Sequence, residues 1–193
     1  QGKEAGKASF RVAGTHVFAA LKLSELHLWE PGNPALYDIT LTLGNDTVSS
    51  YYGMRSIAYD DNLFYLNGKP VFQRLVLDQG FYPDGIYTAK DDATLKRDIE
   101  LSMALGFNGA RLHQKVFEPR FLYYCDKMGY LVWGEHANWG LDLQKPEAFK
   151  GFLPEWIEIL RRDCSHPAIV GWCPFNETGG QDPELVKAVY DLT

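Results

Sequence analysis

Apolar and polar positions follow two different patterns in two parts of the chain. Up to about residue 58, short apolar runs and strict alternation of apolar and polar side chains predict β-strands and no helix. A turn at Gly44-Asn45-Asp46 separates two of these predicted strands. The pattern is typical of part of a β-sandwich. The strands are expected at Ser9–Val12, Val17–Leu23, Leu36–Leu43 and Thr47–Tyr52.

The junction between the two patterns lies near residue 58. Before it, Trp29–Pro34 is interpreted as a loop with Trp29 as a core anchor, and a last strand is expected at Gly53–Ile57. Asp60-Asp61-Asn62 predicts a linker. Phe64–Phe72 then forms a predicted hairpin, because Asn67-Gly68 at its centre supplies the positive φ angles of a type I′ turn. We therefore divide the chain into two domains, residues 1–58 and 59–193.

After the hairpin, apolar strands alternate with amphipathic helices. Four consecutive βα units imply right-handed crossovers and a parallel sheet. Because a closed barrel of eight such units takes about 250 residues, we expect the first half of a barrel and a chain that is a fragment of a longer polypeptide. The strands are expected at Leu75–Leu77, Phe107–Leu112, Tyr130–Trp133 and Ala168–Cys173, and the helices at Asp91 or Asp92 to Met103, Glu118–Met128, Pro154–Arg162 and Pro183–Leu192.

Polar residues follow each of the four predicted strands. The carboxyl ends of parallel strands meet at one face, so these side chains are expected to converge there. A carboxylate just past a buried strand, with an amide before it and glycines after it, suits a general acid/base, which makes Glu177 the candidate for the chemistry. The candidate set is Asp78, Arg111, His113, Glu135, Trp139, Asn176 and Glu177.

Composition and net charge exclude some classes of binding partner. The 193 residues are 46% hydrophobic and carry a net charge of −6, which suits a globular protein with an ample core. An acidic balance without a Lys/Arg run argues against nucleic acid and anionic membrane surfaces. The three cysteines are interpreted as free thiols, and no Cys/His spacing matches a zinc site, so neither metal nor cofactor is expected. The chain opens at Gln1 without a Met, and the compartment stays open.

Several segments together resemble the retaining β-glycosidases of glycoside hydrolase family two. Asp163–Pro167, Gly171-Trp172 and Asn176-Glu177 resemble the acid/base segment of that family. Leu28–Tyr37 resembles the signature loop of its immunoglobulin-like domain, and Leu66–Pro70 is typical of the hairpin that plugs the bottom of its barrel. The resemblance implies part of an immunoglobulin-like β-sandwich followed by the first half of a TIM (β/α)8 barrel.

The resemblance also implies roles for the candidate residues. Glu177 would be the acid/base, with a pKa raised by burial and by the nucleophile's charge. Asn176 would bond the sugar 2-hydroxyl, a contact that strengthens in an oxocarbenium-like transition state. Arg111 would orient the nucleophilic carboxylate, which the family supplies beyond Thr193; alternatively it forms a structural ion pair with Glu135. Glu135 would bond Arg111 or a sugar hydroxyl.

Three candidates have weaker assignments. Trp139 would stack on a sugar face or simply pack within a lid loop. Asp78 lies across the rim as a substrate-binding candidate. Many family members have a Ser-His-Tyr-Pro run after the arginine, whereas this chain reads Leu112-His113-Gln114-Lys115, so the usual role of that histidine does not carry over to His113.

The resemblance implies a retaining exo-β-glycosidase, with β-galactosidase as the first choice and β-glucuronidase and β-mannosidase still open. A non-catalytic sugar-binding module is the alternative from another class, and the joint presence of Arg111, Asn176 and Glu177 favours the enzyme. A cellulase-like endo-glycanase is disfavoured by the preceding sandwich and the Asn67-Gly68 hairpin. The expected partner is a carbohydrate, and open sheet edges would also promote self-association.

Overall fold

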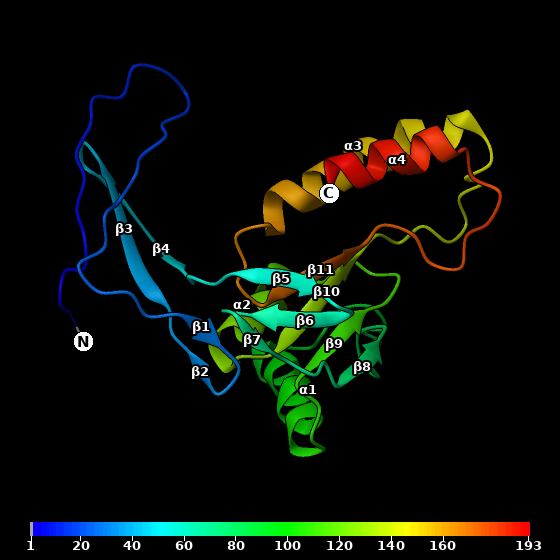
Figure 1. Cartoon of the computed structure of the whole chain (residues 1–193), viewed down its shortest axis with the longest axis horizontal. Helices are drawn as coiled ribbons and strands as arrows, with labels where there is room; N and C mark the ends of the chain where they lie inside the picture. The colour runs from blue at the N-terminus through cyan, green and yellow to red at the C-terminus, as the bar shows by residue number, and fades with distance from the viewer. Residues whose placement is uncertain (1) are drawn as a thin grey trace.

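The computed structural model describes residues 2–193 and has an extended N-terminal part beside an α/β part (Figure 1). Residues 2–27 contain no helix or strand, so the strands predicted at Ser9–Val12 and Val17–Leu23 are wrong. Strand-like composition reports how well side chains fit a sheet surface, and a strand also needs a paired neighbour. In this segment Phe18 is 96% exposed, and within residues 2–27 one backbone bond, Ser24 N to Ala5 O at 2.8 Å, joins distant positions.

Two antiparallel hairpins follow. β1 (Trp29–Glu30) pairs with β2 (Asn33–Pro34), so the predicted loop contains a small ladder. β3 (Tyr37–Leu43) pairs with β4 (Asp46–Tyr52), which confirms this predicted pair of strands and its turn. The sheet formed by β3 and β4 has two strands.

The segment around the expected domain junction is continuous antiparallel sheet. β5 (Ile57–Asp60), β6 (Leu63–Leu66) and β7 (Lys69–Pro70) form one three-stranded sheet. Asp61 and Asn62 have φ angles of 45° and 63°, which is the geometry of a tight hairpin turn, so the predicted linker is wrong. Asn67 and Gly68 have φ angles of 54° and 73°, as a type I′ turn requires. The expected boundary at residues 58 and 59 therefore falls inside β5.

The rest of the chain is a four-stranded parallel sheet with helices, as predicted. The sheet order is β11-β10-β9-β8, so the strands add in chain order. Figure 1 shows α1 below the sheet and α3 and α4 side by side above it. The elements are β8 (Leu75–Asp78), α1 (Asp92–Ala104), β9 (Gly109–Leu112), α2 (Pro119–Met128), β10 (Leu131–Glu135), α3 (Pro146–Asp163), β11 (Ile169–Cys173) and α4 (Pro183–Leu192).

Local sequence explains most helix ends. The Asp91 side chain accepts a hydrogen bond from Thr94 N at 2.8 Å and caps α1. Gly129 ends α2 in the left-handed conformation with a φ of 72°. The start of α3 differs from the prediction, since the helix begins at Pro146 and Pro154 lies inside it. Proline suits the first turn of a helix, and the sequence offers two prolines for that position, of which the structure uses the earlier.

The N-terminal part is fastened to the α/β part by buried polar contacts. Trp29 is fully buried and its Nε1 donates to Asp126 O at 2.7 Å, which confirms the predicted core anchor. Asp126, also fully buried, accepts from Tyr51 Oη at 2.7 Å and Ala168 N at 2.9 Å, and lies 2.6 Å from His166 Nδ1. These contacts join β4, α2 and the segment before β11 into one unit. No helix within residues 2–193 is both long and apolar enough to cross a membrane.

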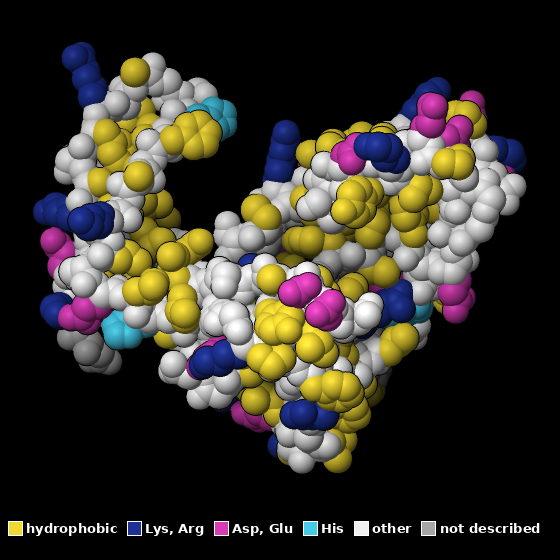
Figure 2. Space-filling model, viewed as in Figure 1, with side chains coloured by type: hydrophobic (Ala, Val, Ile, Leu, Met, Phe, Trp, Pro, Cys, Tyr) yellow, Lys and Arg dark blue, Asp and Glu magenta, His cyan; other side chains and the backbone are white. Residues whose placement is uncertain are grey.

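Apolar side chains also lie on the surface. Figure 2 shows them along the N-terminal arm and over the helices near the C-terminus. Phe18 is 96% exposed and Tyr190 on α4 is 78% exposed. Apolar surface of this kind is often covered by another part of a protein or by a partner.

Candidate active site

The carboxyl ends of β9 and β10 bring Arg111 and Glu135 together. Trp133 pairs with Arg111 across the parallel ladder, so Glu135 lies just beyond it at the rim. Arg111 Nε donates to Glu135 Oε2 at 2.7 Å, and Glu135 is 1% exposed. This hydrogen bond raises the pKa of Arg111, although partial burial acts in the opposite direction. The contact expected between these two residues is therefore present.

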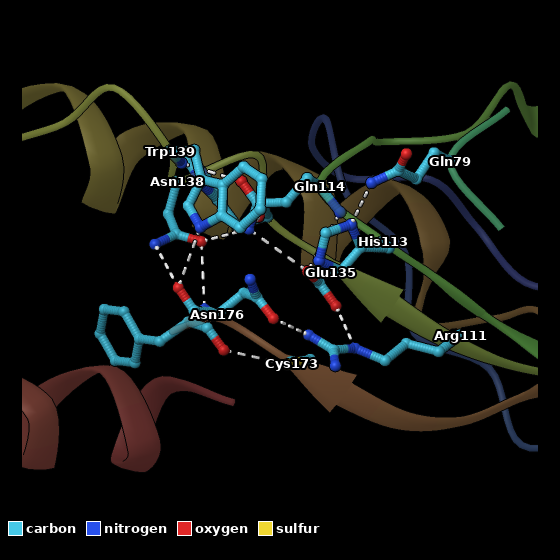
Figure 3. A network of polar contacts seen from close by, with 11 residues as sticks. Gln79, Arg111, His113, Gln114, Glu135, Asn138, Trp139, Cys173 and Asn176 are labelled. Carbon is cyan, nitrogen blue, oxygen red and sulfur yellow. Dashed lines mark hydrogen bonds and ion pairs between the residues drawn. The ribbon is translucent and has the colours of Figure 1, made fainter. Parts of the chain in front are cut away.

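Gln114 connects Glu135 to the loop after β10. It has a φ of 52°, which is unusual for a residue with a side chain. Its backbone N donates to Glu135 Oε1 at 3.0 Å, and its side chain Nε2 donates to Asn138 Oδ1 at 2.5 Å. Its Oε1 accepts from Trp139 N at 2.8 Å. Figure 3 shows Gln114 between Glu135 and Asn138 in this network.

Asn176 is held by both its side chain and its backbone. Its Oδ1 accepts from the guanidinium of Arg111 at 2.5 Å. Its backbone N donates to Asn138 Oδ1 at 3.1 Å, and its carbonyl accepts from Asn138 Nδ2 at 3.4 Å and Trp139 Nε1 at 3.3 Å. Asn176 Nδ2 is buried and has no hydrogen-bond partner among the described residues. A buried donor without a partner is costly, so this amide is the free group of the network.

Glu177 follows Asn176 and leaves the network. Its side chain is exposed, so the burial expected for it is not found. Its backbone has a φ of 47°, in the left-handed region that costs roughly 1–2 kcal/mol for a residue with a Cβ. Asn176 is the last buried residue before an exposed run from Glu177 to Gly180, which follows the end of β11.

His113 and Trp139 lie at the edge of the network. His113 is 5% exposed and its Nδ1 lies 2.9 Å from Gln79 Nε2. Its ring lies 5.3 Å from that of Trp139, edge to face. Trp139 is 54% exposed, so a large part of the indole faces outward beside Asn176. The two residues thus lie together at the rim, as expected for strand-end side chains.

Asp78 does not join this network in the structure. Its Oδ1 accepts from Gly80 N at 2.8 Å within its own loop. Burial raises the pKa of Asp78, while the Gly80 bond and Lys115 lower it. The residue lines a cavity of about 220 Å³ with Asp98 and Tyr130, between β8 and α1. Its proposed substrate contact therefore remains a prediction without support from the hydrogen bonds of the described chain.

Comparison with known proteins identifies the family. The family model for glycosyl hydrolases family 2 matches residues 1–55. A beta-glucuronidase of Rattus norvegicus is 30% identical over 90% of this chain, and a beta-galactosidase of Vibrio cholerae is 28% identical over 79% of it. The chain belongs to glycosyl hydrolase family 2.

Parts of solved structures are similar in fold to this chain. A beta-galacturonidase of family 2 from Eisenbergiella tayi, bound to galacturonate, has a TM-score of 0.82 and 25% identity over 89% of this chain. A beta-glucuronidase of Ruminococcus gnavus in complex with a substituted uronic isofagomine has a TM-score of 0.79 and 26% identity over 89% of the chain. The chain spans 32% of each of those structures, 28% of the rat relative and 16% of the Vibrio relative.

Sequence reasoning missed two members of the network in this family 2 chain. The sequence pattern does not single out Gln114 or Asn138 as site residues. Both are nearly or fully buried, with exposures of 9% and 1%. The available signal was their position, since each follows a buried strand within three residues. Within residues 2–193, no group of three or more His, Cys, Asp or Glu side chains could hold a metal ion.

Proposed function

We propose that this chain supplies the acid/base side of the active site of a retaining exo-β-glycosidase. The observation that carries the proposal is Asn176, whose side chain is fixed by Arg111 while its buried Nδ2 is left to donate. An amide donor of this kind suits the sugar 2-hydroxyl, where a hydrogen bond strengthens as the oxocarbenium-like transition state forms. The next residue, Glu177, is exposed at the same rim and is free to meet a leaving group.

The proposed reaction has two steps. Protonated Glu177 gives its proton to the glycosidic oxygen while a second carboxylate attacks the anomeric carbon and the bond to the leaving group breaks. The Glu177 carboxylate then takes a proton from water, whose oxygen displaces the enzyme carboxylate from the sugar. Retention needs the two carboxylates roughly 5–5.5 Å apart. The second carboxylate is expected beyond Thr193, in a later part of the barrel.

Glu135 and Arg111 are assigned supporting roles. The Arg111 guanidinium bonds both Glu135 and Asn176, so it couples the buried carboxylate to the amide that would contact sugar. Because Glu135 already accepts from Arg111 and from Gln114, it is poorly suited to act as the nucleophile. We infer that it orients the arginine. The proposed architecture is part of an immunoglobulin-like sandwich followed by the first half of a TIM barrel, with self-association through its exposed apolar surface.

The sugar is proposed as a terminal β-linked hexose or hexuronide. Relatives named as beta-galactosidases support the first, and structural neighbours named as beta-glucuronidase and beta-galacturonidase support the second. A panel of nitrophenyl β-galactoside, β-glucuronide, β-galacturonide and β-mannoside, tested on the full-length protein, separates these possibilities. Absence of turnover on all four would favour the non-catalytic sugar-binding module.

The decisive test of the acid/base role is Glu177→Gln in the full-length protein. Hydrolysis of an alkyl glycoside should fall by about 10²–10⁴-fold, because this leaving group needs a proton donor. For a dinitrophenyl glycoside, kcat/KM, which reports the first step, should change much less. Its kcat should still fall because the second step uses Glu177 as a base, and azide, which needs no base, should restore part of that turnover. Glu158→Gln is the matched control, since Glu158 is likewise exposed but lies within α3 rather than after a strand of the sheet. Equal losses of kcat/KM on both substrates would remove Glu177 from this role.

The 193-residue chain by itself tests the division of the catalytic groups. It should bind sugar weakly and hydrolyse no nitrophenyl glycoside, because one carboxylate alone cannot both protonate the leaving group and form the glycosyl-enzyme. Turnover that disappears in Glu177→Ala would instead place the nucleophile within these residues.

A further inference from the structure

Five residues, Asn176 among them, form a closed ring of hydrogen bonds through side-chain and backbone groups. Arg111 bonds Glu135, Glu135 accepts from Gln114, Gln114 donates to Asn138, Asn138 accepts from Asn176, and Asn176 accepts from Arg111. Figure 3 shows these residues converging from the ends of β9, β10 and β11. The proposed function uses only Arg111, Glu135 and Asn176, so the contribution of Gln114 and Asn138 needs an explanation of its own.

The side chain of Asn138 forms hydrogen bonds with both the backbone N–H and the backbone C=O of Asn176. Its Oδ1 accepts from Asn176 N at 3.1 Å, and its Nδ2 donates toward Asn176 O at 3.4 Å. A side-chain amide that pairs with the N–H and C=O of one residue imitates a strand neighbour. Because Asn138 is 1% exposed, water does not compete for these groups. The peptide that leads into Glu177 is therefore fixed by a side chain from another loop.

Gln114 fixes the orientation of Asn138. Asn138 Oδ1 accepts from both Gln114 Nε2 and Asn176 N, so a rotated amide would place its NH₂ against two donors. Gln114 is itself oriented, because its Oε1 accepts from Trp139 N while its Nε2 faces the acceptors Asn138 Oδ1 and Glu135 Oε1. Each amide thus has one orientation that satisfies its neighbours.

Glu177 is held in a backbone conformation that needs such support. Its φ of 47° is disfavoured for a residue with a Cβ, and conformations of this kind persist when the surrounding structure over-determines them. We propose that Gln114 and Asn138 are positioning residues that hold Asn176 and thereby aim Glu177 at the leaving group. This inference rests on the acid/base role proposed above. It assigns Gln114 a function at a position where the sequence departs from the Ser-His-Tyr-Pro run of many relatives.

The test uses Asn138→Ala and Gln114→Ala in the full-length protein, with kinetics on an alkyl glycoside and on a dinitrophenyl glycoside. A misaimed proton donor should cost about 10- to 100-fold in kcat on the alkyl substrate. The dinitrophenyl substrate should be much less affected in its first step, and the basic limb of the pH–rate profile should shift. A role in folding alone would lower both activities equally and leave the pH profile unchanged.

Two further variants keep the test decisive. Asn138→Asp has nearly the same shape and keeps the acceptor for Gln114 and Asn176, but loses the Nδ2 donor; it should show a smaller selective loss and carries the test if Asn138→Ala does not fold. Asn108→Ala is the matched control, because Asn108 also bonds two backbone groups, Arg74 N at 2.7 Å and Phe72 O at 2.9 Å, at the opposite end of the sheet. It should not change the ratio between the two substrates.

The outcomes separate this inference from the proposed function. If Glu177→Gln discriminates between the two substrates and the Gln114 and Asn138 variants do not, the positioning role alone is overturned. If Glu177→Gln also fails to discriminate, the acid/base proposal falls and the positioning role falls with it. Selective losses in both sets, with Asn108→Ala unchanged, support the inference.

Discussion

The carboxylates of Glu135 and Asp126 are both buried, yet their surroundings differ. Glu135 is 1% exposed and Asp126 is fully buried. The Asp126 oxygens are hydrogen-bonded to Tyr51, His166 and Ala168, which come from β4 and from the segment before β11. Around Asp126 the contacts join separate parts of the chain, as in a structural joint.

The hydrogen bonds around Glu135 instead connect it to residues at the rim of the sheet. Arg111 and Gln114 bond it, and through them it reaches Asn176, whose Nδ2 is free, and the exposed Glu177. The difference teaches that burial and ion pairing do not by themselves mark a site. A site is marked here by a buried donor without a partner, Asn176 Nδ2, and by the exposed acid Glu177 that follows it.

The largest effect is expected at the joint. Asp126→Ala should lower the free energy of unfolding by about 3–5 kcal/mol, because it leaves a histidine, a phenol and a backbone N–H without their buried acceptor. Asp126→Asn, which retains one acceptor oxygen, should lose less. Denaturant unfolding of the full-length protein measures both. A change in the leaving-group dependence of the remaining activity would contradict a purely structural role.

The next effect is expected at the rim. Glu135→Gln should lower activity on both alkyl and dinitrophenyl glycosides by about 10- to 100-fold, a misplacement cost of the kind seen when orienting groups are lost. A carboxylate accepts on both oxygens, whereas an amide has one acceptor and would turn an NH₂ toward Arg111 or Gln114. Stability should fall by only about 1–3 kcal/mol. A loss confined to the alkyl substrate would instead group Glu135 with Gln114 and Asn138, as a residue that aims the proton donor.

Much of the fold could be predicted from the pattern of apolar residues. The four βα units, the β3–β4 hairpin and the Asn67-Gly68 turn follow from local periodicity and turn chemistry, and all three are observed. The errors at Ser9–Val12 and Val17–Leu23 have one cause. Strand propensity describes a single segment, whereas a strand exists only with a neighbour to pair with.

The site could be predicted in part. The position of polar residues after strands predicts that Arg111, Glu135 and Asn176 lie close together, and their hydrogen bonds confirm it. The roles of Gln114 and Asn138 depend on the direction of individual amide groups, which spacing along a sequence does not contain. The exposure of Glu177 could not be predicted from the sequence either, because burial of a loop residue depends on which other segments pack over it.

A smaller effect on stability is expected from the histidines near Asp126 and Glu135, because the surroundings of His166 and His136 differ. His166 contacts Asp126, whereas His136, next to Glu135, turns away and packs 4.1 Å from the Phe152 ring. Its Nε2 lies 3.4 Å from Glu155 Oε2, and neither ring nitrogen has a hydrogen-bond partner among the described residues. Burial lowers the pKa of His136, and Glu155 opposes this shift.

The sign of the pH dependence follows from that shift. The unfolded chain, with a histidine pKa near 6.5, binds the proton before the folded chain does, so this group should reduce stability as the pH falls through about 6.5. In His136→Phe this contribution should vanish, and the variant should gain stability relative to the parent between pH 7.5 and 5.5. Unfolding curves at several pH values measure the difference. Parallel pH dependences would show that His136 does not contribute.

The smallest effect on stability is expected from Trp139, the exposed aromatic residue at the Glu135 end of the network. Its indole is 54% exposed, and its one side-chain hydrogen bond, to Asn176 O at 3.3 Å, is duplicated by Asn138 Nδ2 at 3.4 Å. Trp139→Ala should therefore change the free energy of unfolding by no more than about 0.5 kcal/mol. If the indole stacks on a sugar face, KM should rise while kcat changes little. Phe72→Ala, which removes a 79% exposed ring on the loop after β7, is the matched control and should leave KM unchanged. An unaltered KM in Trp139→Ala would mean that the indole only packs within its loop, and the difference between the rim and the joint would then rest on Asn176 and Glu177 alone.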